Sequence, residues 1–299
     1  MKYDSLLVYT YGGPETLDDV LPFLENITQG RGVAPHRLQS VMQHYEYFGG
    51  KSPLNDYTRR FLDAIAPLVE IPVYWGCRFA SPSVEETIQR MIYDGIRRAL
   101  VLIPSPFGGY NRIYFQKMRD LERKFGSAFP ILHYIPPFSQ QPRFWDAVCA
   151  TLNEVATLRD RSVRENCSLV FSVHSLPVEV AKLRYEREAR AAVEGISARL
   201  ETEGFPGRKF LAWQSESKTA ARWLEPRLDD VLREVATFRG CRETILVPIG
   251  FPFENMEVAY DLDVQARELG ESLGLSISRA PTTGLHPTFL EMVRGYLDY

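Results

Sequence analysis

Cysteine is scarce in this chain, and the few cysteines present are not paired in the sequence. None stands in a C-x-x-C spacing, and they are spread over the chain at Cys77, Cys149, Cys167 and Cys241. Zinc ribbons and local iron–sulfur ligand sets need closely spaced cysteines. We therefore expect reduced thiols and no local cysteine motif for a metal.

Long apolar runs and a dominant charge sign are also missing. No stretch approaches the roughly 18 apolar residues that a membrane span requires, and residues 1–4 lead directly into a strand-like run without a signal-type leader. The formal net charge of −3 provides no basic field for nucleic acid. We expect a soluble, cytoplasmic protein with no transmembrane segment and no nucleic-acid ligand.

Glycine pairs occur, but the known phosphate-loop patterns are absent. Gly12-Gly13 and Gly49-Gly50 belong to neither G-x-x-x-x-G-K-[ST] nor G-x-G-x-x-G. The sequence therefore disfavours nucleotide binding.

What the chain does contain is a regular alternation of short apolar runs and amphipathic segments. Such alternation predicts parallel sheets that are covered by helices on both faces. We expect an α/β protein of two similar Rossmann-like lobes, each with a four-stranded parallel sheet flanked by helices. The eight runs are 5–11, 71–79, 99–103, 131–135, 168–173, 210–213, 244–249 and 275–278.

The pair Pro136-Pro137 is the best candidate for the crossover between the lobes. It predicts an N-terminal lobe at 1–140 and a C-terminal lobe at 141–286. We expect the C-terminal helix, 287–299, to pack back on the first lobe.

Two segments carry further helix signals. Ser83-Val84-Glu85-Glu86 is a capping box that predicts a helix to Tyr93, with Gly95 just past its end. Segment 178–203 is charged on one side and small and apolar on the other, which predicts a surface helix.

His174 directly follows the run 168–173 and precedes Ser175-Leu176-Pro177. In open parallel sheets ligands bind outside the carboxyl ends of the strands. A histidine there can be a base, a proton acceptor or a metal ligand, and a capping or core role is the structural alternative. The other histidines lack this setting and are expected to be structural or exposed: His36, His44, His133 and His286.

Glu257 begins a predicted helix just after the run 244–249. With Asp261 it forms an i, i+4 pair, and Gln265 continues the same face. Acid groups at a helix start also suit the helix dipole, which is a structural alternative. Functionally, the two carboxylates could pass a divalent cation inward or protons outward, and with one histidine they would hold a metal transiently.

Aromatic residues cluster next to glycines in segments 45–48 and 110–115. Such clusters usually belong to a core, although a planar apolar ligand would need walls of this kind. The sequence leaves both interpretations open.

Several segments together resemble the ferrochelatase family, and the resemblance runs nearly end to end. The most specific is S-V-H-S-L-P at 172–177, which is similar to the family's S-A-H-S-L-P. The others are L-L-V-Y-T-Y-G-G-P at 6–14, F-G-G-K-S-P-L at 48–54, W-Q-S-E at 213–216 with W-L-E-P at 223–226, and V-P-I-G-F at 247–251 followed by Glu257.

The resemblance implies a lyase of haem biosynthesis that inserts Fe2+ into a free-base porphyrin held between two lobes, with release of two protons. It implies His174 and Glu257 as catalytic residues, and His174, Glu257 and Asp261 as the residues that meet the metal. Ferrous iron is then a substrate, with no permanently bound cofactor and no iron–sulfur cluster. The expected partners are the porphyrin, ferrous iron and a haem acceptor protein, and a monomer is expected.

The resemblance also implies five substrate-binding residues: Tyr11, Arg31, Ser52, Trp213 and Phe115. Tyr11 stands where the small monomeric bacterial enzymes acting on coproporphyrin carry a tyrosine, which favours coproporphyrin III over protoporphyrin IX. Arg31 is the arginine that remains in loop 28–31 and is expected to contact a propionate. Phe115 stands where the family has a tyrosine near the metal.

The chain departs from the family pattern close to the predicted site. Glu254-Asn255 replaces the D-H that precedes the glutamate, so the second histidine is gone. The G-D-P-Y segment after Leu176-Pro177 is replaced by a charged helix. These differences bear on substrate identity and rate more than on the fold.

Three other functions fit part of the sequence. A non-catalytic relative would bind porphyrin or haem, but His174 and Glu257 are both present. A chelatase of another tetrapyrrole, such as sirohydrochlorin, typically shows further histidines in place of W-Q-S. A two-lobed solute-binding protein would normally carry a secretion signal.

Overall fold

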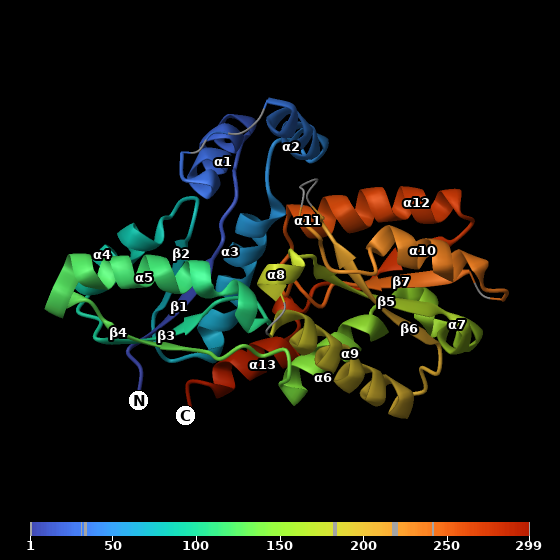
Figure 1. Cartoon of the computed structure of the whole chain (residues 1–299). Coiled ribbons are helices and arrows are strands. Elements are labelled where there is room, and N and C mark those ends of the chain that lie inside the picture. Colours follow the sequence, from blue (N-terminus) through green and yellow to red (C-terminus); the bar gives the residue numbers. More distant parts are fainter. Residues whose placement is uncertain are drawn as a thin grey trace.

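The apolar runs form eight strands within the described part of the chain, and these build two sheets of four parallel strands. The computed structural model describes residues 2–30, 32, 35–181, 184–216, 221–240 and 242–298, without the side chains of His36, Arg37 and Tyr110. The strand order is β2-β1-β3-β4 in one sheet and β6-β5-β7-β8 in the other. The expected α/β fold of two similar lobes is confirmed (Figure 1).

Strands and helices alternate along both lobes. The first sheet and its helices are β1 Ser5–Thr10, α1 Val20–Thr28, α2 Pro35–Tyr47, α3 Pro53–Ile65, β2 Val73–Cys77, α4 Val84–Tyr93, β3 Arg98–Leu102, α5 Arg112–Phe125 and β4 Ile131–Tyr134. The second part contains α6 Pro142–Asn153, α7 Arg161–Asn166, β5 Ser168–His174, α8 Val178–Ala181, α9 Tyr185–Thr202, β6 Arg208–Gln214, α10 Leu228–Thr237, β7 Glu243–Val247, α11 Met256–Tyr260, a π-helix Asp261–Ala266, α12 Arg267–Ser272 and β8 Ser276–Arg279. The last helix is α13 Pro287–Gly295.

The first sheet is covered on both faces, because neighbouring residues of a strand point to opposite sides. On β1, Leu6 and Val8 are buried in the core that contains α3, whereas Leu7 and Tyr9 are buried with residues of α4 and α5. A strand that is buried on both faces has to be largely apolar. This is why β1 appears in the sequence as an apolar run.

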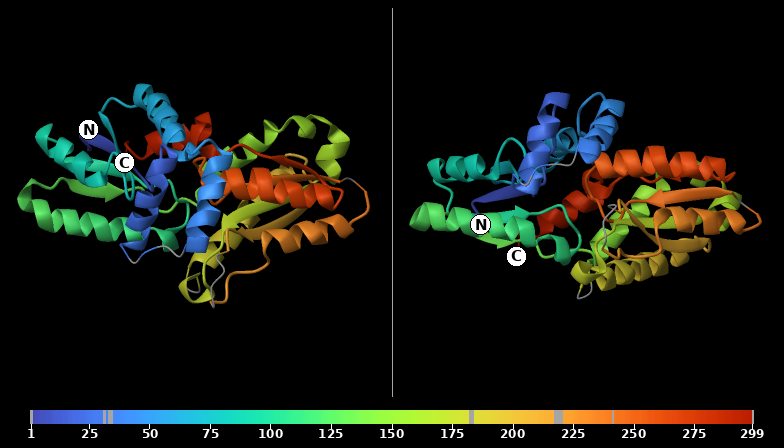
Figure 2. Two further views of the ribbon diagram at one scale, coloured as in Figure 1. Left: turned by 90° about the horizontal axis from the view of Figure 1, so that it is seen from above. Right: turned by 45° about the horizontal axis from the view of Figure 1, so that its top comes forward.

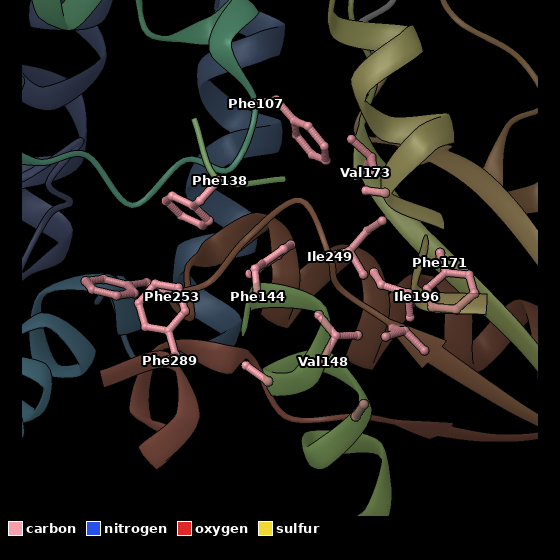
Figure 3. Close-up of a cluster of buried hydrophobic side chains, with 14 of the residues drawn as sticks. Phe107, Phe138, Phe144, Val148, Phe171, Val173, Ile196, Ile249, Phe253 and Phe289 are labelled. Carbon is pink, nitrogen blue, oxygen red and sulfur yellow. The ribbon is translucent and has the colours of Figure 1, made fainter. Parts of the chain in front are cut away.

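The two lobes share one hydrophobic core, shown in Figure 3. Phe138, after β4, packs edge-on against Phe144 of α6 with 5.3 Å between ring centroids. Phe61 of α3 lies 4.8 Å from Phe253, which is in the loop between β7 and α11. The shared core therefore holds the loop that leads to Glu257 against the first lobe.

The first sheet ends at Tyr134, and α6 begins at Pro142 beyond the Pro136-Pro137 pair. Helix α13 contacts both α6 and α3, so it lies where the lobes meet (Figures 1 and 2). Every helix in the described ranges is too short or too polar to span a membrane.

The capping box that was expected at Ser83 is confirmed. The Ser83 hydroxyl accepts the Glu86 N–H at 3.2 Å, and the Glu86 carboxylate accepts the Ser83 N–H at 2.9 Å. The single helix expected over 178–203 is wrong, because α8 ends at Ala181 and α9 begins only at Tyr185.

Candidate active site

The carboxyl end of β5 and the start of α11 bring His174 and Glu257 together. His174 is the last residue of β5, and Glu257 lies in the first turn of α11. The His174 Nε2 and Glu257 Oε1 atoms are 3.4 Å apart, and the two side chains are 25% and 47% exposed. The two residues that the strand end and the helix start indicated are therefore direct neighbours in space.

His174 has an acceptor at each ring nitrogen. Nδ1 is 2.5 Å from the carbonyl oxygen of Ser175, and Nε2 faces the Glu257 carboxylate. Two acceptors favour the doubly protonated imidazolium. The backbone is fixed as well, because the Tyr185 hydroxyl donates to the His174 carbonyl at 2.9 Å.

The two charges shift each other's protonation. Burial lowers the pKa of His174, but the charge and hydrogen bond of Glu257, together with smaller contributions from the Ser175 carbonyl and the Asp261 charge, outweigh burial and raise that pKa to about 8. Burial raises the pKa of Glu257, and the opposing influence of His174 leaves this pKa below its usual range. At neutral pH the pair is therefore an imidazolium beside a carboxylate.

We expect the His174 imidazole to titrate at about pH 8 in the wild type and at a lower pH in Glu257→Gln, because burial then acts without the carboxylate and only the Ser175 carbonyl and the Asp261 charge still raise the pKa. Histidine NMR titration measures both values, and Glu268→Gln on the exposed side of α12 is the matched control. Since folding raises this pKa, the pairing stabilises the fold fully below pH 6.5, and the contribution is lost as pH rises through about 8. A wild-type value at or below 6.5 would contradict the pairing.

A second carboxylate, Asp261, follows on the same helical segment and is held by the residues after β6. The Ser215 hydroxyl donates to Asp261 from a left-handed backbone conformation with φ of 63°. Gln214 donates through Nε2 to the Glu257 carbonyl at 3.0 Å. Burial raises the pKa of Asp261 to about 7, against the effect of the Ser215 hydrogen bond. Asp261 can therefore exchange a proton near neutral pH.

Gln265, which was expected to continue the face of Glu257 and Asp261, lies in a helix of a different type. Helix α11 ends at Tyr260, and the backbone turns into a π-helix from Asp261 to Ala266. A π-helix has i→i+5 hydrogen bonds and therefore wider turns than an α-helix, and the position of Gln265 relative to the two carboxylates stays a prediction. Gln265 is exposed in this arrangement.

Asn255, which stands in place of the family's second histidine, caps α11. Its Oδ1 accepts the Val258 N–H at 3.0 Å, and its Nδ2 donates to the Phe253 carbonyl at 3.3 Å. Asparagine is among the preferred N-cap residues. Asn255 therefore fixes the start of the helix that carries Glu257.

Helix α2 of the first lobe lies against α11. His44 stacks on Tyr260 with 3.8 Å between ring centroids, and Tyr47 meets the same ring edge-on at 6.2 Å. Tyr45 is buried, and the nearby Glu257 charge adds to burial in raising the pKa of Tyr45. The aromatic segment 45–48 is therefore part of the wall around the site.

Tyr11 lies at the carboxyl end of β1, within an aromatic group of the first lobe. Its ring is 4.6 Å from that of Phe79 and 6.1 Å from that of Phe23. These rings provide an apolar surface at the carboxyl edge of the first sheet. Ligands of open parallel sheets bind at this edge.

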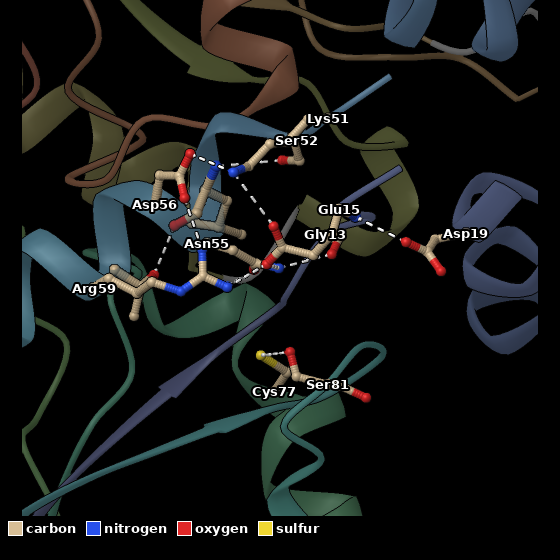
Figure 4. Close-up of polar contacts among 12 residues, drawn as sticks. Gly13, Glu15, Asp19, Lys51, Ser52, Asn55, Asp56, Arg59, Cys77 and Ser81 are labelled. Atoms are coloured by element: carbon tan, nitrogen blue, oxygen red, sulfur yellow. Dashed lines mark hydrogen bonds and ion pairs between the residues drawn. The ribbon is translucent and has the colours of Figure 1, made fainter. Parts of the chain in front are cut away.

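Ser52 has a structural role as the N-cap of α3. It is 3% exposed and caps α3 by accepting the Leu54 N–H at 3.3 Å. An ion-pair network beside it ties α3 to the loop after β1 (Figure 4); its members are Glu15, Lys51, Asp56 and Arg59. Contact between Ser52 and a substrate stays a prediction.

Two other predicted substrate residues, Trp213 and Phe115, pack against aromatic neighbours away from the His174–Glu257 contact. Trp213 is 1% exposed and packs against Tyr185 at 5.9 Å, so it lies behind the site in the core. Phe115 packs against Tyr134 of β4 at 4.8 Å and lines a pocket of about 410 Å³ on that side of the first lobe. Arg31 lies outside the described residues.

Among the described residues, no three His, Cys, Asp or Glu side chains converge as a ready metal site. His174 and Glu257 form a pair, while Asp261 is engaged by Ser215. This donor set fits an ion in transit better than a resident metal, which would need three or four protein ligands.

Three residues around the site were not predicted from the sequence: Ser215, Tyr185 and Tyr45. Ser215 belongs to the W-Q-S motif, and Tyr45 to the aromatic cluster, so both carried a signal. Tyr185 carried none, because its contact with the His174 carbonyl depends on how α9 packs against β5.

The fold is that of the chelatases with two α/β lobes. SirB from Bacillus subtilis, solved with Fe3+, superposes with a TM-score of 0.60 at 11% identity, covering 98% of this chain and 94% of that chain. The sirohydrochlorin chelatase SirB from Bacillus subtilis subspecies spizizenii, in complex with cobalt, gives 0.56 at 12% identity, covering 96% and 90%. At this identity the likeness shows the fold alone.

The sequence is matched by the family model for ferrochelatase over residues 3–298. The coproporphyrin III ferrochelatase of Mycolicibacterium paratuberculosis is 35% identical over 100% of this chain and 88% of its own length. That of Frankia alni is 38% identical over 99% of this chain and 79% of its own length. The chain belongs to the ferrochelatase family.

Proposed function

We propose that this protein is a lyase that inserts Fe2+ into coproporphyrin III in haem biosynthesis. The reaction exchanges two pyrrole N–H protons for one ferrous ion and gives the iron porphyrin and two protons. The observation that carries the proposal is the His174–Glu257 pair, 3.4 Å apart, in a chain that matches the ferrochelatase family over 3–298. Ferrous iron is a substrate here, and no permanently bound cofactor is part of the proposal.

The pair can couple the arrival of the metal to the removal of protons. With Glu257 ionised, His174 holds its proton up to about pH 8. A ferrous ion that contacts Glu257 neutralises the carboxylate, which removes the largest influence that raises the pKa of His174, and this pKa falls. The imidazole then loses its proton and becomes a base for a pyrrole N–H.

Asp261 gives the protons a way out of the site. Its pKa of about 7 lets it accept a proton from the buried side and release it to water at neutral pH. Ser215 keeps the carboxylate in place by donating to it. In this scheme His174 acts first and Asp261 second.

The aromatic walls supply the binding energy that the reaction requires. A flat macrocycle does not readily admit an ion from its face, so part of the binding energy is used to pucker the ring. In this proposal Tyr11, which packs against Phe79 in the first lobe, contacts the planar apolar macrocycle.

The choice of coproporphyrin III rests on two observations. The curated relatives that match over the whole chain are coproporphyrin III ferrochelatases. By the sequence resemblance, Tyr11, which directly follows β1, corresponds to a tyrosine of the small bacterial enzymes that act on coproporphyrin. The proposal further includes a cytoplasmic monomer that passes its product to a haem acceptor protein.

The test is a comparison of coproporphyrin III and protoporphyrin IX under anaerobic conditions with Fe2+ or Zn2+. We expect kcat/KM for coproporphyrin III to exceed that for protoporphyrin IX by at least about tenfold, which corresponds to about 1.4 kcal/mol of transition-state binding. A preference for protoporphyrin IX would reverse the substrate assignment. No turnover with either porphyrin would favour a protein that binds porphyrin or haem without converting it.

A further inference from the structure

Arg279, the last residue of β8, is surrounded by acceptors from the segment that carries the catalytic carboxylates. Its side chain is 16% exposed. Nε and Nη2 donate to the two Asp263 oxygens at 2.7 and 2.9 Å. Nη1 and Nη2 donate to the two Glu254 oxygens at 3.0 and 3.3 Å, and Nη1 also donates to the Ala280 carbonyl at 3.4 Å. These contacts match the five donors of a guanidinium.

The two carboxylates bound by Arg279 lie on either side of the site residues in the sequence. Glu254 directly precedes the cap of α11 and is also held by the Thr282 hydroxyl, which donates to it at 3.0 Å. Asp263 lies in the π-helix just beyond Asp261. One guanidinium therefore fixes both ends of the stretch from which Glu257 and Asp261 project.

This stretch needs an external constraint. A π-helix is a rare and less stable form of helix, and the direction in which Asp261 projects depends on its register. The planar guanidinium binds each carboxylate through two nitrogens and so sets the orientation as well as the distance. A lysine ammonium in the same place would keep the positive charge but could not bind each carboxylate through two nitrogens.

Arg279 also borders a surface pocket of about 490 Å³ that is lined by Tyr47, Phe48, Asp263, Val264 and Arg267. An arginine in such a pocket suggests an anion site. Its donors, however, are directed to Asp263, Glu254 and Ala280, all within this chain. The contacts therefore favour a role in holding this segment of the chain in place over a role in binding a ligand.

We propose that Arg279 is a positioning residue for metal insertion, which places Glu257 and Asp261 by holding Glu254 and Asp263 and touches neither porphyrin nor metal. The inference rests on the proposed function. A carboxylate displaced by about 1 Å can lower the rate about 100-fold even when the fold persists. The chemistry should therefore suffer more than porphyrin binding.

The test compares Arg279→Lys with the wild type and with Arg161→Lys, in which the arginine is 90% exposed and pairs with Glu165. Thermal unfolding reports the fold, porphyrin fluorescence gives the dissociation constant for coproporphyrin III, and Zn2+ insertion gives kcat and the metal KM. We expect Arg279→Lys to lose 10- to 100-fold in kcat/KM for the metal, with porphyrin affinity within about twofold of wild type. Arg161→Lys should match the wild type in every measurement.

Wild-type kcat/KM in folded Arg279→Lys would overturn the proposal. A loss of porphyrin affinity as large as the loss of rate would also overturn it, because Arg279 would then be a substrate contact. If Arg279→Lys does not fold, Glu254→Gln and Asp263→Asn each weaken one of the two ion pairs of Arg279. Each variant is expected to lower kcat without weakening porphyrin binding. Normal rates in both would overturn the proposal. An inactive wild type would instead refute the proposed function.

Discussion

In His174→Ala we expect metal insertion to fall by about 1000-fold or more while coproporphyrin still binds. The His174 imidazole ends β5 and pairs with the Glu257 carboxylate, and in the proposed mechanism it is the general base. A positioned general base typically raises the rate 100- to 10,000-fold. Porphyrin affinity should persist, because the aromatic walls do not include this side chain. Zn2+ insertion followed by absorbance, with porphyrin fluorescence for binding, measures both properties.

The matched control for this variant is His133→Ala. His133 is exposed on the edge strand β4 of the other lobe, so its loss should leave the insertion rate unchanged. A wild-type rate in His174→Ala would remove His174 from the mechanism. Loss of both rate and porphyrin binding would show that the residue shapes the pocket and does not act as the base.

In Glu257→Gln we expect a loss of about 100-fold or more in kcat/KM for the metal. The amide keeps the size of the side chain and leaves the Asn255 cap in place, but it removes the charge that attracts the cation and that raises the pKa of His174. Both consequences follow from one change, since metal arrival and proton removal are coupled through this carboxylate. Steady-state rates over a range of Zn2+ or Fe2+ concentrations give the metal KM separately from kcat.

Glu268→Gln is the control for charge alone, because Glu268 is exposed on α12, close by in the sequence but turned to solvent. It should behave as the wild type. An unchanged metal KM and kcat in Glu257→Gln would contradict the role given to Glu257, and activity would then have to depend on Asp261.

The fold could be predicted from the sequence because both sheets are buried on two faces. Burial on both faces requires strands that are largely apolar, as in β1 and β5, and these are visible as short runs. His174 could be predicted for the same reason, since the rule for ligands at strand ends depends only on where the run stops. Glu257 followed from the start of the next helix.

The remainder of the site depends on tertiary contacts that leave little trace in the sequence. The π-helix over Asp261–Ala266 is a local change of helix type, and no residue pattern marked it. The contact between Arg279 and Glu254 joins β8 to the loop before α11. Trp213 lies next to the site in the sequence, yet its ring is turned into the core.

The most direct test of metal insertion is an anaerobic titration of the coproporphyrin III complex with Fe2+ in weakly buffered solution, followed at the free-base visible bands and with a pH indicator. We expect the free-base bands to disappear during turnover, with two protons released for each porphyrin converted. Porphyrin that stays bound with its free-base spectrum unchanged, and with no proton release, would contradict the account and indicate a binding protein.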